Sequence, residues 1–115
     1  MKRARVISVV NQKGGVGKTT LSAFLSLAPS SRGKTLAIDL DANNNLTDFF
    51  ARDVDDATIE GANAYHLLTK KKPASECVVS CGLFTDLVPG ALALHQLTVE
   101  MINRPAALLS VRSLL

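Results

Sequence analysis

Tryptophan is absent from this 115-residue chain, and other aromatic side chains are few: one tyrosine and four phenylalanines. We therefore expect an aliphatic core, which suits strands rich in Val, Ile, Leu and Ala that are covered on both faces. The 47% apolar content excludes a disordered chain. No apolar run approaches the roughly 20 residues of a membrane span, and no signal-peptide pattern is present. These absences predict a cytoplasmic protein without a membrane partner.

Cysteine and histidine are also scarce. Cys77 and Cys81 form a C-x-x-x-C pair, and no histidine lies near enough to complete the ligand set of a zinc site. Their apolar neighbours favour small buried thiols, and His66 and His95 are expected to be surface or packing residues. Thirteen basic and ten acidic residues give a net charge of +3, which weakly favours an anionic partner such as DNA.

The most informative feature that is present is a glycine-rich loop. Residues 13–20 read K-G-G-V-G-K-T-T; they follow an apolar run at 6–10 and precede a helical pattern at 18–27. Strand, glycine loop and helix form the context that a phosphate-binding loop requires. Glycines allow backbone N–H groups to approach a polyphosphate closely, and the helix N-terminus adds positive partial charge. A glycine-rich turn with a chance lysine is the alternative, and it needs four coincidences.

Each residue type in this loop has a chemical reason to be there. The Lys18 ammonium would lie on the β- and γ-phosphates of a nucleotide, and the Thr19 hydroxyl would bind Mg²⁺. The predicted phosphate-binding residues are Lys13, Gly14, Gly15, Val16, Gly17, Lys18, Thr19 and Thr20.

Two carboxylates follow the next apolar run. Asp39 and Asp41 lie at the end of a predicted strand over residues 35–40. At positions i and i+2 they point differently, so one carboxylate can serve a metal ion and the other a water molecule. The alternative is a polar strand end that caps a loop. The glycine loop earlier in the chain favours the functional interpretation.

Strand-like and helical segments alternate along the chain. The patterns predict strands at 4–10, 35–40 and 84–88, helices at 18–27 and 106–115, and three helices between: a short one capped by Asn45, one capped by Asn63, and one carrying Leu94 and Leu97. Lys70, Lys71 and Lys72 are expected to end the second of these helices, with a DNA contact as the alternative. This alternation predicts an α/β doubly wound sheet in a single domain.

At this point the chain resembles a known family. Residues Asn11–Thr20 look like the deviant Walker A motif of the ParA/MinD ATPases, and Asn11-Gln12 is similar to the ParA/Soj partition proteins in particular. Residues Leu36–Thr47 resemble the D-L-D-P-Q-G-N-x-T segment of that family. The departures from this segment are Ala42 for Pro, Asn43 for Gln and Asn44 for Gly.

The resemblance implies a P-loop NTPase three-layer fold with a mostly parallel sheet, and an ATPase that uses ATP and Mg²⁺. Lys18 would be the Walker A lysine, Lys13 would reach the nucleotide of the partner subunit in an ATP-bound homodimer, and Asp41 would orient the attacking water. Thr19 and Asp39 would serve the metal. The implied process is plasmid or chromosome partition with a DNA-bound partner of ParB type, and non-specific DNA binding through parts not present here.

The family's next element is the Walker B strand, an apolar run that ends in Asp, and residues 106–115 do not contain one. We therefore expect residues 1–115 to be the N-terminal part of one ParA-like domain, with an unpaired central strand at 4–10. One alternative is a non-catalytic nucleotide-binding or interaction fragment. A less favoured one is another deviant Walker A enzyme, such as an iron–sulfur reductase subunit or metal-carrier ATPase, for which Cys77 and Cys81 are poorly placed.

Overall fold

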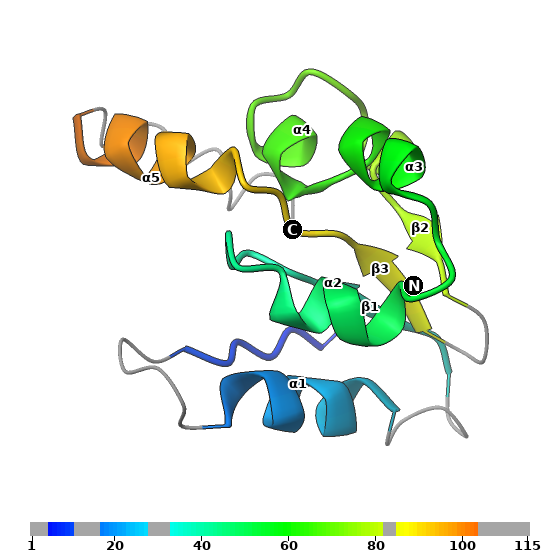
Figure 1. The fold of residues 1–115 in the computed structure, drawn as a ribbon. Helices are drawn as coiled ribbons and strands as arrows, with labels where there is room; N and C mark the ends of the chain where they lie inside the picture. The colour runs from blue at the N-terminus through cyan, green and yellow to red at the C-terminus, as the bar shows by residue number, and fades with distance from the viewer. Residues whose placement is uncertain (1–4, 11–16, 28–32, 82–84, 104–115) are drawn as a thin grey trace.

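The computed structural model describes residues 5–10, 17–27, 33–81 and 85–103. In chain order its elements are α1 (Lys18–Leu27), β1 (Thr35–Ile38), α2 (Asn45–Phe50), α3 (Asp56–Gly61), α4 (Ala64–Leu68), a 3-10 turn η2 (Ala74–Glu76), β2 (Val79–Ser80), β3 (Thr85–Val88) and α5 (Leu94–Asn103). Figure 1 shows helices on both sides of a small central sheet. No helix among the described residues is long and apolar enough to cross a bilayer.

The sheet has three strands in the order β1-β3-β2. β1 and β3 are parallel, with Thr35 opposite Thr85 and Ile38 opposite Val88. β2 runs antiparallel to β3, so the sheet that the structure describes is mixed, where the sequence predicted a mostly parallel one. The parallel pair matters most for function, because both strands end at the same level and release the chain at the same edge.

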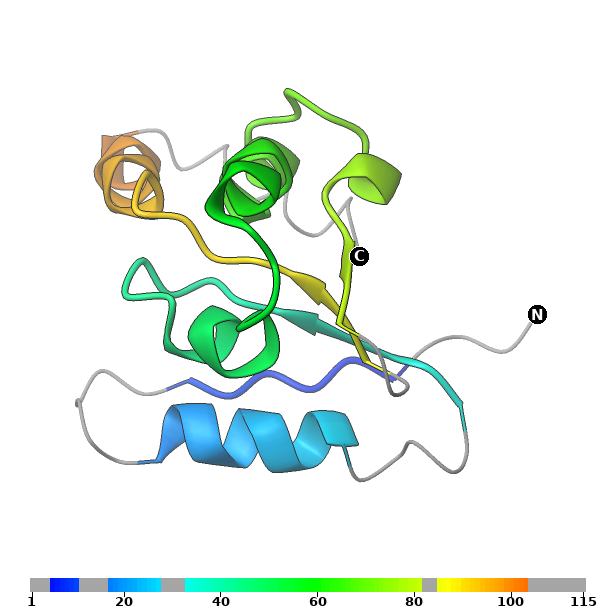
Figure 2. The same ribbon diagram turned by 45° about the vertical axis from the view of Figure 1, so that its right-hand side comes forward.

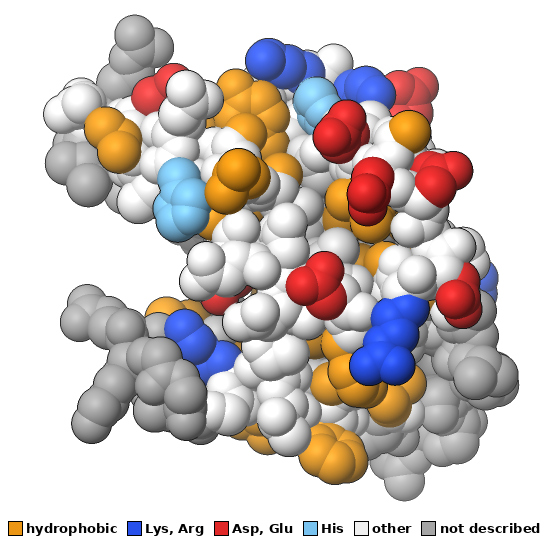
Figure 3. Space-filling model, in the orientation of Figure 1, with side chains coloured by type: hydrophobic (Ala, Val, Ile, Leu, Met, Phe, Trp, Pro, Cys, Tyr) orange, Lys and Arg blue, Asp and Glu red, His pale blue; other side chains and the backbone are white. Residues whose placement is uncertain are grey.

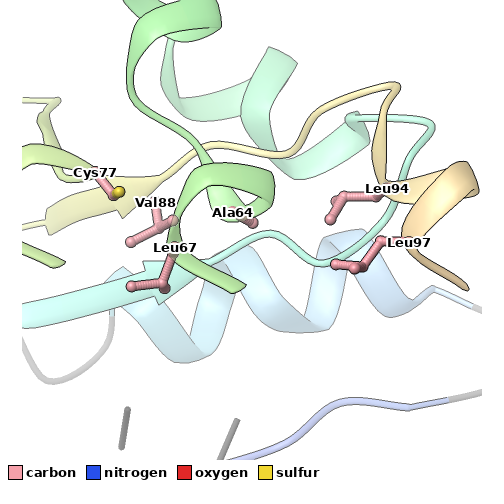
Figure 4. Close-up of a cluster of buried hydrophobic side chains, with 6 residues drawn as sticks. All are labelled: Ala64, Leu67, Cys77, Val88, Leu94 and Leu97. Atoms are coloured by element: carbon pink, nitrogen blue, oxygen red, sulfur yellow. The ribbon is translucent and has the colours of Figure 1, made fainter. Parts of the chain in front are cut away.

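Two core clusters lie on opposite faces of this sheet. Val88 packs with Ala64, Leu67, Cys77, Leu94 and Leu97, which brings α4 and α5 onto one face (Figure 4). Leu87, the preceding residue, packs with Ala23, Ala37, Leu46 and Ala51, which brings α1 and α2 onto the other. Neighbouring strand residues point to opposite faces, so the short β3 anchors both helical layers. Figure 2 shows the sheet between these layers.

The strand predicted at 4–10 is not observed in its described part, residues 5–10. This segment lies between α1 and the sheet in both ribbon views (Figures 1 and 2), yet Val6, Ile7 and Val10 remain 62%, 59% and 84% exposed. The apolar residues of this segment indicate that it would be buried if it formed a strand. A strand also requires a hydrogen-bonded neighbour, and no described strand pairs with residues 5–10.

The helix predictions met mixed outcomes. α1 has the predicted bounds, and the Asn63 side chain caps α4 by accepting a hydrogen bond from the backbone N–H of His66 at 3.2 Å. Asn45, predicted as the cap of α2, is instead its first residue, and the N-cap position is Asn44. The sequence patterns predicted neither α3, which Asp55 caps, nor β2. The segment predicted as a helix at 106–115 lies outside the described residues.

Two of the three consecutive lysines make contacts around α3 and α4. Lys71 lies over the Tyr65 ring, with its Nζ 4.9 Å from the ring centroid. The Nζ of Lys72 donates to the carbonyl of Gly61, the last residue of α3. A cation at a helix C-terminus stabilises the unpaired carbonyls there. This contact supports the capping interpretation of the lysine run, although Lys72 caps α3 and the sequence had suggested α4.

Candidate functional site

Those predicted site residues that the structure describes lie on one side of the molecule. In both ribbon views the start of α1 and the chain segments that leave β1 and β3 are on the same side (Figures 1 and 2). The space-filling view shows the surface hollowed here, between α5 and the region where α1 begins (Figure 3). The carboxyl ends of parallel strands are where α/β proteins bind ligands, so the fold places the candidate site at this edge.

The described end of the glycine loop is a left-handed residue that leads directly into α1. Gly17 has a φ of +86°, a left-handed conformation that favours glycine, and its carbonyl accepts the backbone N–H of Leu21 at 2.9 Å. α1 therefore begins at Lys18, and Thr19 and Thr20 lie in its first turn, which carries no acidic residue. An acid-free helix N-terminus suits an anion. Lys13, Gly14, Gly15 and Val16 lie outside the described residues.

Asp39 follows β1 and is 4% exposed. Its Oδ1 accepts the backbone N–H of Asp41 at 3.0 Å, and its Oδ2 accepts the backbone N–H of Thr47 at 2.9 Å and the hydroxyl of Thr47 at 2.6 Å. Three donors thus converge on one buried carboxylate. They explain how a charge is tolerated there, and they tie the end of β1 to the first turn of α2.

Asp41 is placed differently. It is half-buried, and its Oδ1 accepts the backbone N–H of Asn43 at 2.9 Å in a local turn. Its backbone N–H is held by Asp39 and its carbonyl accepts the N–H of Asn44 at 3.0 Å. The backbone of Asp41 is therefore anchored on both sides, while the side chain makes one exposed hydrogen bond. The two aspartates that the sequence paired by spacing have distinct surroundings.

Asn44 explains one departure from the family segment. It has a φ of 59° and a ψ of 25°, the left-handed conformation, and it stands where the resembling segment has Gly. Asparagine is among the few residues other than glycine that adopt this conformation readily. The substitution therefore keeps the backbone path and adds a side chain, whose Oδ1 is buried without a hydrogen-bond partner among the described residues.

Gly90, in the turn after β3, packs closely against this loop. A Cβ at Gly90 would meet the Oδ1 of Asn44, would lie 2.8 Å from the carbonyl oxygen of Asp41, and would lie 3.1 Å from Cγ of Asp39. The backbone of Gly90 also donates its N–H to the hydroxyl of Thr47 at 2.7 Å. We call Asp39, Asp41, Asn44, Thr47 and Gly90 the Asp39 cluster; it joins the ends of β1 and β3.

Thr47 is a buried polar residue of this cluster that sequence reasoning did not single out. It is 2% exposed, and its hydroxyl both donates to Asp39 and accepts from Gly90. The signal was present, because Thr47 occupies the threonine position of the D-L-D-P-Q-G-N-x-T segment. Nothing in its local spacing indicated a partner 43 residues away.

The hydrogen bonds of Asp39 limit how it could contact a metal ion. A carboxylate has about four lone-pair positions, and three of those of Asp39 are used by protein donors. One remains on Oδ1, which suffices for a metal-bound water and not for a bidentate metal contact. No group of three or more His, Cys, Asp or Glu residues that could hold a metal occurs among the described residues, so a metal would also need oxygen atoms from Thr19 and a nucleotide.

The two cysteines belong to the hydrophobic core clusters and are not part of the Asp39 cluster. Cys77 is fully buried in the core cluster of α4 and α5, and Cys81 is half-buried against the opposite cluster. Burial raises the pKa of both thiols, and for Cys81 the neighbouring Asp86 carboxylate raises it further. Both are free thiols, as the sequence predicted.

Comparison with known proteins agrees with this geometry. The family model AAA_31, described as an AAA domain, matches residues 4–115. The chain is 36% identical over 111 residues to the chromosome-partitioning ATPase Soj of Thermus thermophilus, covering 94% of this chain and 41% of that protein. It is 34% identical over 103 residues to the chromosome partitioning protein ParA of Myxococcus xanthus, covering 87% and 35%. The chain thus spans well under half the length of these relatives.

Solved structures give the same result. A plasmid partition protein from Borrelia burgdorferi superposes with a TM-score of 0.76 at 28% identity, covering 83% of this chain and 42% of that one. A structure described as a putative plasmid partition protein from the same organism bound to AMPPNP gives a TM-score of 0.65 at 29% identity, over 73% of this chain and 36% of that one. The small α/β fold described above therefore matches part of these partition proteins.

Proposed function

We propose a nucleotide-dependent role for this chain because it belongs to the AAA_31 domain family, that of the ParA/Soj-type partition ATPases. The proposed role is an ATP-binding and ATP-hydrolysing dimerisation switch for plasmid or chromosome partition. The observation that carries it is the left-handed Gly17 followed directly by the start of α1 at Lys18 and Thr19. This arrangement would present helix N–H groups, a lysine and a hydroxyl to a polyphosphate.

The proposed division of labour combines the family resemblance with the hydrogen bonds of the described residues. Lys18 would neutralise the β- and γ-phosphates, and Thr19 would hold Mg²⁺, which supplies charge neutralisation of the phosphates when bound. Asp39 would orient a metal-bound water through its remaining lone pair. Asp41 has the less constrained carboxylate and would orient the attacking water.

Two parts of the proposal concern a second molecule. Lys13 would reach the nucleotide of a partner subunit, and a DNA-bound protein of ParB type would act on the ATP-bound dimer. Support for these parts comes from the family alone. A nucleotide-binding fragment that does not hydrolyse ATP is the second candidate.

A thermal melt of the 115-residue chain, with and without Mg²⁺ and a non-hydrolysable ATP analogue, tests nucleotide binding. A ligand at about 100 times its Kd stabilises a folded site by roughly 2.7 kcal/mol. We expect this shift in the wild type and its loss in Lys18→Ala. The control Lys34→Ala removes the same charge from an exposed position before β1 and should keep the shift. Wild type and Lys18→Ala melting alike with nucleotide would refute the proposal.

Phosphate release, measured with Mg²⁺ and ATP in place of the analogue, separates the two candidates. Measurable release that requires Lys18 would favour the hydrolysing switch. A full thermal shift without release would favour the nucleotide-binding fragment.

A further inference from the structure

We infer that Thr47 is a positioning residue of the nucleotide site, a role that rests on the function proposed above. Its hydroxyl fastens the loop carrying Asp39 and Asp41 to the turn after β3, and so fixes Asp41 at the edge of the sheet. Thr47 itself is 2% exposed and is buried against protein; its effect on a ligand is therefore exerted through the two aspartates.

The Thr47 hydroxyl donates one hydrogen bond and accepts another. A hydroxyl has one proton and two lone pairs. The proton of Thr47 goes to Oδ2 of Asp39 at 2.6 Å, and a lone pair receives the N–H of Gly90 at 2.7 Å. The negative carboxylate fixes the donor direction, because it can only accept. The hydroxyl therefore links a buried anion to a buried backbone donor, and valine, which has the same shape, can make neither bond.

The path from Thr47 to Asp41 runs through the carboxylate of Asp39. Asp39 uses its other oxygen, Oδ1, to accept the backbone N–H of Asp41 at 3.0 Å. Thr47 holds one side of the carboxylate, and Asp41 is held by the other. The rotation of the Asp39 side chain about χ2 is thereby fixed from both sides. Loss of the Thr47 hydroxyl would leave Oδ2 with one donor, the backbone N–H of Thr47, and would loosen this rotation.

The two loops also approach each other closely. The carbonyl of Asp41 lies near enough to Gly90 that a Cβ there would come within 2.8 Å. Gly90 is buried and its N–H has Thr47 as its acceptor. The Thr47 hydroxyl thus orients Asp39 and also holds the backbone of Gly90, against which the Asp41 backbone packs. The Asp39 cluster acts as one unit with the hydroxyl of Thr47 at its centre.

Amide hydrogen exchange in the 115-residue chain, measured by NMR, tests the inference without requiring activity. In Thr47→Val we expect exchange at Gly90 and Asp41 to rise about fivefold to tenfold, the factor for one ordinary hydrogen bond. Thr47→Ser keeps the hydroxyl and should restore slow exchange. Thr85→Val is the matched control, because Thr85 is equally buried on β3 and its hydroxyl contacts the carbonyl of Ser26 at 3.4 Å, at the other end of the strand.

Several results would overturn the inference. Unchanged Asp41 exchange in Thr47→Val would do so, and so would a Thr47→Ser variant as perturbed as Thr47→Val, since the methyl group would then be the important part. Should Thr47→Val fail to fold, the wild type answers the question. We expect a slowly exchanging Thr47 hydroxyl proton with a nuclear Overhauser effect to the Gly90 amide, and a hydroxyl proton in fast exchange with water would refute it.

The nucleotide readout separates this inference from the proposed function. Because the Thr47 hydroxyl orients Asp39, which is proposed to hold a metal-bound water, Thr47→Val should lose most of the thermal shift with Mg²⁺ and the ATP analogue. Thr47→Ser and Thr85→Val should keep it. A wild type that shows no shift would refute the proposed function, and the exchange result would still decide whether Thr47 positions the loop. A full shift in Thr47→Val despite fast exchange at Asp41 would show that positioning does not serve nucleotide binding, which overturns the inference.

Discussion

Replacing Asp39 by asparagine keeps the shape of the side chain and removes its charge. Three protein donors point at the carboxylate: the N–H of Asp41, and the N–H and hydroxyl of Thr47. An asparagine offers one oxygen and one NH₂ group. Whichever way the amide is turned, its NH₂ faces at least one backbone N–H, so one or two buried donors lose their acceptor.

The magnitude follows from this count. A buried donor left without a partner costs about 1–3 kcal/mol, so Asp39→Asn should lower the free energy of unfolding by about 2–4 kcal/mol. That is a large share of the roughly 5–15 kcal/mol typical of a whole protein. At roughly 4 °C per kcal/mol, the melting temperature should fall by about 8–16 °C.

Urea unfolding followed by circular dichroism measures the change. Asp41→Asn is the matched control, because the Asp41 side chain accepts a single exposed hydrogen bond, from Asn43; we expect a change within about 0.5 kcal/mol. Equal losses in the two variants, or an Asp39→Asn variant as stable as the wild type, would refute the assignment of Asp39 as the organiser of the loop.

Two further predictions concern protonation. Hydrogen bonds from the side chain and backbone of Thr58 lower the pKa of Asp55. The contribution of Asp55 to stability is therefore present above the unfolded pKa of about 3.9 and is lost as the pH falls through the lower folded pKa. The chemical shift of the Thr58 amide in an acid titration should have its midpoint below about 3.9, and a midpoint above that value contradicts the prediction. Burial raises the pKa of Cys77 and Cys81, so the free energy of unfolding should fall above pH of about 8.5, where the unfolded thiols ionise. A thiol reagent at pH 8 should label half-buried Cys81 first, and equal labelling rates would contradict the burial of Cys77.

The regular elements with strong local signals could be predicted from the sequence. α1 has the predicted bounds, and β1 and β3 lie within the predicted strands, because apolar periodicity and turn residues agree there. β2 has two residues, too few for any periodicity to appear. α3 is short and contributes no buried residue, so its sequence has no apolar face to detect.

Residues 5–10 show a different limit. Their apolar content is typical of a buried strand. Strand pairing, however, depends on a second segment as well. β1 has β3 on one edge, and no described strand pairs with it on the other. Local sequence therefore predicts that Val6 and Ile7 would be buried in a strand. It cannot predict whether a neighbouring strand is there to pair with them.

The site divides in the same way. Spacing along the chain predicted a pair of aspartates, Asp39 and Asp41, two residues apart after one strand. Their different surroundings depend on Thr47 and Gly90, and Gly90 comes from another strand end. The left-handed Asn44 was noticed only as a departure from the family segment, and its backbone angles explain it.

The Asp39 cluster also has a consequence for the order of folding. The contact between Asp39 and Thr47 spans eight residues, whereas that between Thr47 and Gly90 spans 43. Short loops close at lower entropic cost than long ones, and distant contacts slow folding. The end of β1 and the start of α2 should therefore associate early, while their attachment to β3 waits for the later half of the chain. During synthesis, the two aspartates would leave the ribosome well before the glycine that completes their surroundings.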